Sequence, residues 1–203
     1  MKPSIKDKTR MQISELAAQI IETEGIKDYL HAKKKAAARL GINSASHMPA
    51  NDEIQQSIIH YQNLFYGKEE KNILHENAIK CLHALELLNG FKPYLTGAYA
   101  GYNPSITADI EIILFLDEQE KLVSCLKSRK IPWQLKTKKM KLPQQQTQEY
   151  SSYQFYAENT LIKIICLPEH ETHTHFIDPV SNKKITKFNH DKSRQHLMTA
   201  FIQ

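Results

Sequence analysis

The spacing of apolar residues along roughly the first ninety positions of the chain predicts helices. Apolar side chains recur there every three or four positions, which is the spacing that buries one face of a helix. A glycine follows the end of each of the four predicted helices, where its conformational freedom lets the chain leave the helix. These glycines are Gly25, Gly41, Gly67 and Gly90. We therefore expect residues 1–90 to form a bundle of four helices joined by short loops.

After Gly90 the pattern becomes typical of strands. Residues 108–116 (ADIEIILFL) are rich in β-branched side chains. The other segments expected to be strands are residues 93–97, 131–137, 150–156 and 161–167. Two helices are expected in this half, at residues 118–130 and from about Asp191 onwards. A chain whose first half is helical and whose second half is rich in strands is typical of the α+β class. We therefore expect a mixed β-sheet domain with flanking helices at residues 91–203.

Composition narrows the class of protein. The 203 residues include 41% apolar and 24% charged side chains, enough of both for a packed core and a hydrated surface. No apolar run approaches the roughly 18–20 residues of a membrane-spanning helix, and the N-terminus lacks the apolar core of a signal peptide. The three cysteines form no CxxC pair, which argues against a disulfide framework or a zinc ribbon. We therefore expect a cytoplasmic protein with no membrane partner, whose oligomeric state the sequence does not predict.

The net charge of +5 is unevenly distributed. Residues 121–141 contain eight basic side chains and no acid, whereas residues 91–120 contain five acidic side chains and one lysine. An acidic cluster beside a basic strip suits a site that holds a metal cation together with nucleotide phosphates. The alternative is two hydrated surfaces that are merely adjacent in sequence.

Two carboxylates mark the most informative segment of the chain. Asp109 and Glu111 are two positions apart on a predicted strand, so both side chains lie on the same face of it. Carboxylates held side by side repel each other unless a cation lies between them, and Mg²⁺ prefers such hard oxygen ligands. Upstream, Gly97 follows a short predicted strand, where a glycine lets the backbone approach a ligand closely. The alternative is an edge strand with an acidic solvent face.

This arrangement resembles the polymerase-beta-like nucleotidyltransferase superfamily. Its hallmark is an apolar residue and a glycine followed by glycine or serine, a spacer of about ten residues, and then Asp-apolar-Asp/Glu-apolar. The matching residues are LTGA at positions 95–98 and DIEI at positions 109–112. In the first half, the segments HAKKKAAARLG and MPANDEI are similar to short bacterial proteins described as nucleotidyltransferase-like.

The resemblance implies that residues 91–203 form a minimal nucleotidyltransferase-like domain. It assigns the catalytic and Mg²⁺-binding roles to Asp109 and Glu111. It places the phosphates of a nucleoside triphosphate beside Gly97 and its neighbours Ala98 and Tyr99. The implied reaction transfers a nucleotidyl group from the triphosphate to a hydroxyl acceptor.

The sequence also departs from the family pattern. Ala98 stands where the family has glycine or serine, and the expected third carboxylate is missing from residues 161–167, whose only charged residue is Lys163. A lysine in that place would repel a metal ion but could bind nucleotide phosphates. Glu149 or Glu158 could replace the missing carboxylate. The alternative function is therefore a catalytically inactive nucleotide- or RNA-binding module, and a third is a structural or partner-binding module.

A run of lysines is the best candidate for a nucleic-acid contact. Lysines displace counterions from a phosphate backbone, and the flanking Trp133 and Tyr150 are available for base stacking. The alternative for Trp133, the only tryptophan, is a place in the core. We expect these lysines in a loop that steers an anionic substrate or RNA. They are Lys136, Lys138, Lys139 and Lys141.

Two further groups have both a functional and a structural interpretation. Four basic residues of the second predicted helix could contact phosphates or form an ordinary hydrated face. They are Lys33, Lys34, Lys35 and Arg39. Three histidines of the HETHTH segment could bind a transition metal or lie exposed in a loop. They are His170, His173 and His175.

Overall fold

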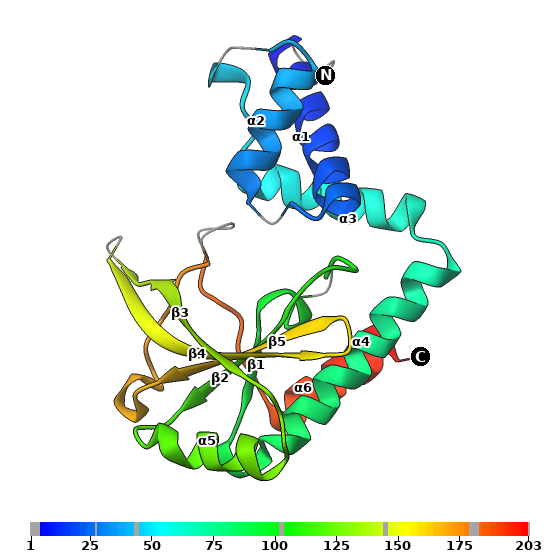
Figure 1. The fold of residues 1–203 in the computed structure, drawn as a ribbon. Coiled ribbons are helices and arrows are strands. Elements are labelled where there is room, and N and C mark those ends of the chain that lie inside the picture. Colours follow the sequence, from blue (N-terminus) through cyan, green and yellow to red (C-terminus); the bar gives the residue numbers. More distant parts are fainter. Residues whose placement is uncertain are drawn as a thin grey trace. The chain divides into compact units, whose positions relative to one another are not determined.

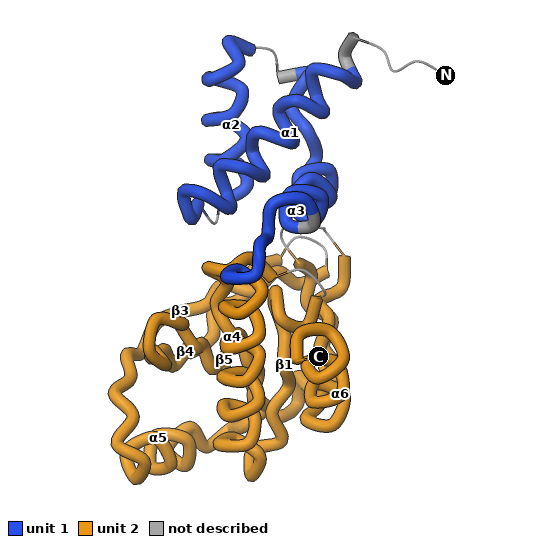
Figure 2. Tube along the Cα trace, turned by 90° about the vertical axis from the view of Figure 1, so that its right-hand side faces the viewer, with its two compact units in different colours: residues 1–70 blue, residues 71–203 orange. Residues whose placement is uncertain are grey.

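The computed structural model shows two compact units, residues 1–70 and residues 71–203, which are coloured separately in Figure 2. The structure describes residues 5–26, 28–42, 45–101, 104–143, 146–178 and 183–202. Within these residues, no helix is both long enough and apolar enough to cross a membrane.

The described residues of the first unit form three complete α-helices. These are α1 (Ile5–Glu24), α2 (Tyr29–Arg39) and α3 (Asn51–Phe65), with a short 3₁₀ helix, η1 (Ala45–His47), before α3. Alanines and isoleucines spaced three or four positions apart form the shared core, because that spacing puts them on one face of each helix. The fully buried members are Ile13, Ala17, Ala18, Ile20, Ala32, Ala36 and Ile54.

Helix α4 (Lys68–Leu87) supplies its apolar face to the second unit. Its residues Ala78, Cys81 and Leu85 are buried in the same core as residues of the sheet. The division between the units falls between Glu70 and Lys71, whereas the sequence predicts this helix in the N-terminal bundle and a boundary near Gly90. The physical reason is that helical periodicity reveals an apolar face but not the partner that covers it.

The second unit contains a six-stranded mixed sheet, which confirms the predicted α+β class (Figure 1). Its spatial order is β3-β4-β5-β2-β1-β6; β2 and β5 are parallel, and every other neighbouring pair is antiparallel. The strands are β1 (Tyr94–Thr96), β2 (Ile110–Phe115), β3 (Gln134–Lys141), β4 (Thr147–Ala157), β5 (Thr160–Leu167) and β6 (Phe188–Asn189). The helices α5 (Gln119–Ser128) and α6 (His190–Phe201) complete the unit.

The two faces of the sheet differ in what covers them. Helices α4, α5 and α6 contribute to the core on one face, where Ile112 and Ile164 of the central strands are fully buried. The opposite face has an apolar part around Ile113 and Ile165, covered by Phe176 from the segment that follows β5. The rest of that face is polar and carries the carboxylates of the candidate site.

Candidate functional site

Asp109 and Glu111 lie where the β2 strand begins. Asp109 directly precedes the strand and Glu111 is its second residue. The intervening Ile110 and the following Ile112 are fully buried in the helix-covered core. Because side chains alternate along a strand, this burial directs both carboxylates to the opposite face. Their side chains are only 11% and 19% exposed, so they are held in a partly dehydrated environment.

Lys163 lies directly beside this pair. The β2 and β5 strands run parallel, and their register places Lys163 opposite Glu111. Its Nζ lies 2.5 Å from Oδ2 of Asp109 and 3.8 Å from Oε1 of Glu111. The lysine that the sequence shows in place of a third carboxylate therefore forms ion pairs with both expected metal ligands.

Lys138 contributes a second ammonium group from a distant strand. Its Nζ lies 2.8 Å from Oε1 of Glu111. The β3 strand is three places from β2 in the sheet, which is about 14 Å in a flat sheet with strands about 4.8 Å apart. A lysine side chain does not span that distance alone, so the twisted β3–β4 hairpin curls over this face of the sheet.

Gly97 packs against the same carboxylate. It follows β1 and opens the short 3₁₀ helix η3 (Gly97–Tyr99), with a φ of +68°, where L side chains are strained. A Cβ at this position would lie 3.2 Å from Oε2 and 3.3 Å from Cβ of Glu111. Glycine is therefore favoured here both by the backbone conformation and by the close approach to Glu111.

The turn that follows Gly97 is anchored from inside the fold. The Tyr99 side chain is fully buried, so only its backbone can contribute to a ligand site at the surface. His196 of α6 donates its Nε2 hydrogen to the carbonyl oxygens of Tyr99 and Gly101, each 3.0 Å away. No pattern in the sequence indicates this role of His196. Gly97 and Ala98 remain exposed.

The charges of this site cancel one another. Two carboxylates, Asp109 and Glu111, are paired with two ammonium groups, Lys138 and Lys163. Mg²⁺ requires several oxygen ligands, and ammonium groups already hold one oxygen of each carboxylate, Oδ2 of Asp109 and Oε1 of Glu111. Among the described residues, no group of three or more histidine, cysteine, aspartate or glutamate side chains is placed to hold a metal ion. The donor set, as arranged here, does not fit the Mg²⁺ that the family resemblance implies.

The two substitute carboxylates lie elsewhere. Glu149 of β4 pairs with Lys139 at 3.3 Å, and both side chains are exposed. Glu158, in the turn between β4 and β5, pairs with Lys80 of α4 at 2.9 Å. Neither carboxylate completes a site with Asp109 and Glu111.

The lysine run lies in a strand, not in the expected loop. In β3, alternation places Lys136 and Lys138 on one face and Lys139 and Lys141 on the other. The four lysines therefore form no single basic surface, and two of them are paired with Glu111 and Glu149.

The two aromatic residues available for base stacking are engaged in the fold, which for Trp133 agrees with the alternative of a place in the core. Trp133 packs against Tyr153, with ring centroids 5.1 Å apart. Tyr150 is buried, and its hydroxyl donates to Glu171 at 2.6 Å. The local sequence could not show this, because the partners are distant along the chain.

The basic residues of α2 have structural contacts. Lys33 donates to the carbonyl oxygen of Pro49 and to Oδ1 of Asn51, each at 3.0 Å. Lys35 and Arg39 both pair with Glu24. These contacts support the interpretation of this helix face as an ordinary hydrated surface, from which Lys34 projects exposed.

The histidines of the HETHTH segment follow β5. His170 is the middle residue of the 3₁₀ helix η5 (Glu169–Glu171). His173 and His175 lie in the turn and the extended segment that follow it. All three are exposed. No described residues join them in a cluster of potential metal ligands.

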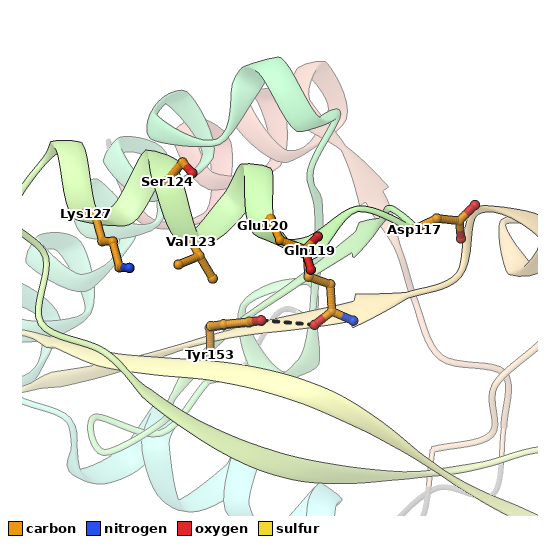
Figure 3. Close-up of a pocket in the computed structure, with 7 residues that line it drawn as sticks. All are labelled: Asp117, Gln119, Glu120, Val123, Ser124, Lys127 and Tyr153. Atoms are coloured by element: carbon orange, nitrogen blue, oxygen red, sulfur yellow. Dashed lines mark hydrogen bonds between the residues drawn. The ribbon is translucent and has the colours of Figure 1, made fainter.

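A hollow of about 440 Å³ lies between α5 and β4. Figure 3 shows the side chains that line it. Its lining residues are Asp117, Gln119, Glu120, Val123, Ser124, Lys127 and Tyr153. Tyr153 pairs in register with Ile164, on the helix-covered face, whereas Lys163 lies on the opposite face. The hollow and the carboxylate site are therefore on different faces of the sheet.

Comparison with known proteins does not identify a family. No protein-family model matches the chain, and no curated protein matches it. The functional argument therefore depends on the geometry of the site.

Proposed function

We propose that the protein is a catalytically inactive nucleotide-binding module with a nucleotidyltransferase-like fold. The observation that carries this proposal is the position of Lys163, whose ammonium group pairs with Asp109 and Glu111. Nucleotidyl transfer in the family relies on those two carboxylates to hold metal ions. With one oxygen of each carboxylate engaged by an ammonium group, they no longer perform that task.

The proposed ligand contact is the exposed turn at Gly97 together with the two ammonium groups beside it. A glycine with positive φ lets the backbone approach a phosphate closely, and ammonium groups donate hydrogen bonds to phosphate oxygens. Lys163 and Lys138 are 20% and 33% exposed, so each still reaches solvent from within its ion pair. A site of this kind binds a nucleoside triphosphate without activating it.

Binding and transfer can be measured separately. Equilibrium binding of a fluorescent ATP analogue to the full chain is expected to be weakened at least tenfold by Gly97→Val. Lys139→Ala is the matched control, because Lys139 lies on the other face of β3 and its removal is expected to leave binding unchanged. In parallel, incubation with labelled triphosphates, Mg²⁺ and cellular RNA or protein is expected to give no incorporation.

Three outcomes would contradict this proposal. Undetectable binding of any triphosphate would remove the nucleotide as ligand. Binding of single-stranded RNA alone, sensitive to Lys136→Ala, would favour the RNA-binding alternative. Incorporation that disappears in Asp109→Ala/Glu111→Ala would establish catalysis.

Metal-dependent nucleotidyl transfer remains the second candidate function because of one observation. Asp109 and Glu111 lie on one face beside Gly97, as transfer chemistry requires. For that function, Mg²⁺ with its nucleotide would have to displace Lys163 from both carboxylates. The incorporation experiment distinguishes the two candidates.

A further inference from the structure

We infer that Lys163 and Lys138 together take the place of a divalent metal ion between Asp109 and Glu111, so that the protein carries its own cation in this site. The inference deepens the proposed function, on which it rests for the identity of the site. It concerns the disagreement between the Mg²⁺ that the family resemblance implies and the side chains that are present.

The first step is the position of Lys163. Parallel pairing of β2 and β5 places it in register with Glu111, and the neighbouring Ile162 and Ile164 are buried in the core. This burial fixes the lysine on the carboxylate face of the sheet. Its Nζ approaches Asp109 to 2.5 Å and Glu111 to 3.8 Å, so one ammonium group serves two carboxylates.

The second step is the charge balance. Asp109 and Glu111 are largely shielded from solvent, and two dehydrated carboxylates on one face repel each other strongly. Lys163 alone supplies one positive charge. Lys138 supplies the second through its 2.8 Å contact with Glu111. The two ammonium groups therefore carry the charge of one divalent ion.

The third step is the competition that a metal ion would face. A divalent cation entering this cluster would have to separate two ion pairs and would be repelled by two ammonium groups nearby. Among the residues that the structure describes, it would find two carboxylates, because Glu149 and Glu158 are committed elsewhere. The arrangement thus favours the resident ammonium groups over Mg²⁺.

Replacement of Lys163 by an acid tests the inference directly. Lys163→Asp places a third carboxylate opposite Glu111 and removes one of the two ammonium groups. Titration of Mn²⁺ into the full chain without nucleotide, followed by the electron paramagnetic resonance signal of free Mn²⁺, is expected to show at least tenfold tighter binding than in the wild type. Asp109→Asn in the Lys163→Asp background is expected to abolish the gain.

Lys163→Met is the matched control, because it removes the charge without adding a ligand. It is expected to bind Mn²⁺ more weakly than Lys163→Asp. The wild-type protein is titrated with Mn²⁺ in the same way. It is expected to show no Mn²⁺ binding that Asp109→Asn removes.

Tight binding of Mn²⁺ to the wild type, lost in Asp109→Asn, would overturn the inference. So would a folded Lys163→Asp variant, by circular dichroism, that gains no affinity for Mn²⁺. Because these titrations contain no nucleotide, a failure of nucleotide binding would overturn the proposed function alone.

Discussion

At Gly97, the absence of a single carbon atom determines the geometry of the site. A methyl group on its α-carbon would lie within van der Waals contact distance of Glu111, and the φ of +68° would strain any L side chain. Lys163 is the second such residue, since its charge determines whether the neighbouring carboxylates face a metal or an ammonium group. These two positions are visible in the sequence as a glycine after a strand and a lysine within one.

The Gly97→Ala substitution is expected to destabilise the protein by about 1–3 kcal/mol, because it imposes a left-handed backbone and a contact with Glu111 on alanine. Urea denaturation followed by circular dichroism measures this change. Gly90→Ala is the matched control: Gly90 has no positive φ, and a Cβ there meets no atom within 4 Å. Equal losses in the two variants would contradict the argument.

Among the secondary-structure elements, the β3–β4 hairpin and the α1–α3 helix pair show how distant residues are joined. The hairpin brings Lys138 to Glu111 across three places in the sheet order. In the helix pair, the buried carboxylate of Glu22 on α1 accepts hydrogen bonds from Gln62 of α3 and from the hydroxyl of Tyr66 just after α3. Neither contact follows from local sequence patterns.

The Glu22 contact predicts a pH dependence of the first unit. Burial raises the pKa of the Glu22 carboxyl above its ordinary value of 4.5. The folded state therefore binds the proton more tightly than the unfolded state, and the free energy of unfolding falls as the pH rises from about 4.5 through the raised pKa. Hydrogen exchange of the α1 amide groups between pH 4.5 and 7 measures this change, after correction for the intrinsic exchange rates.

Glu22→Gln removes the titrating group and is expected to flatten that pH dependence. Glu24→Gln is the matched control on the same helix. In the wild type, the hydrogen bond with Lys35 lowers the pKa of the Glu24 carboxyl. Any dependence of the free energy of unfolding on Glu24 therefore has the opposite sign, and its contribution to stability is lost as the pH falls. An unchanged slope in Glu22→Gln would contradict the assignment to Glu22.

At the scale of the whole molecule, the sequence was sufficient to predict the class of fold and the β2 strand. The β-branched residues predicted β2, and the period of two along a strand predicted the shared face of Asp109 and Glu111. The single charged residue of the fifth strand predicted Lys163 as a departure from the pattern of the family that the chain resembles. These predictions succeeded because they depend on short-range periodicity.

The contacts that complete the site were beyond sequence analysis. The association of α4 with the sheet, the curl that brings Lys138 to Glu111 and the anchoring of the Gly97 turn by His196 all join distant segments. Such contacts are set by tertiary packing, which a periodic pattern does not specify. The same limit explains why the sequence did not show the partners within the fold against which Trp133 and Tyr150 pack.

The affinity of the wild-type protein for a nucleoside triphosphate, measured in excess Mg²⁺ and again in excess EDTA, tests the central claim most directly. If resident ammonium groups replace the metal ion, the two dissociation constants agree within about threefold. A triphosphate that binds at least tenfold more weakly in EDTA would show that the carboxylates recruit a divalent ion after all, and would contradict the account.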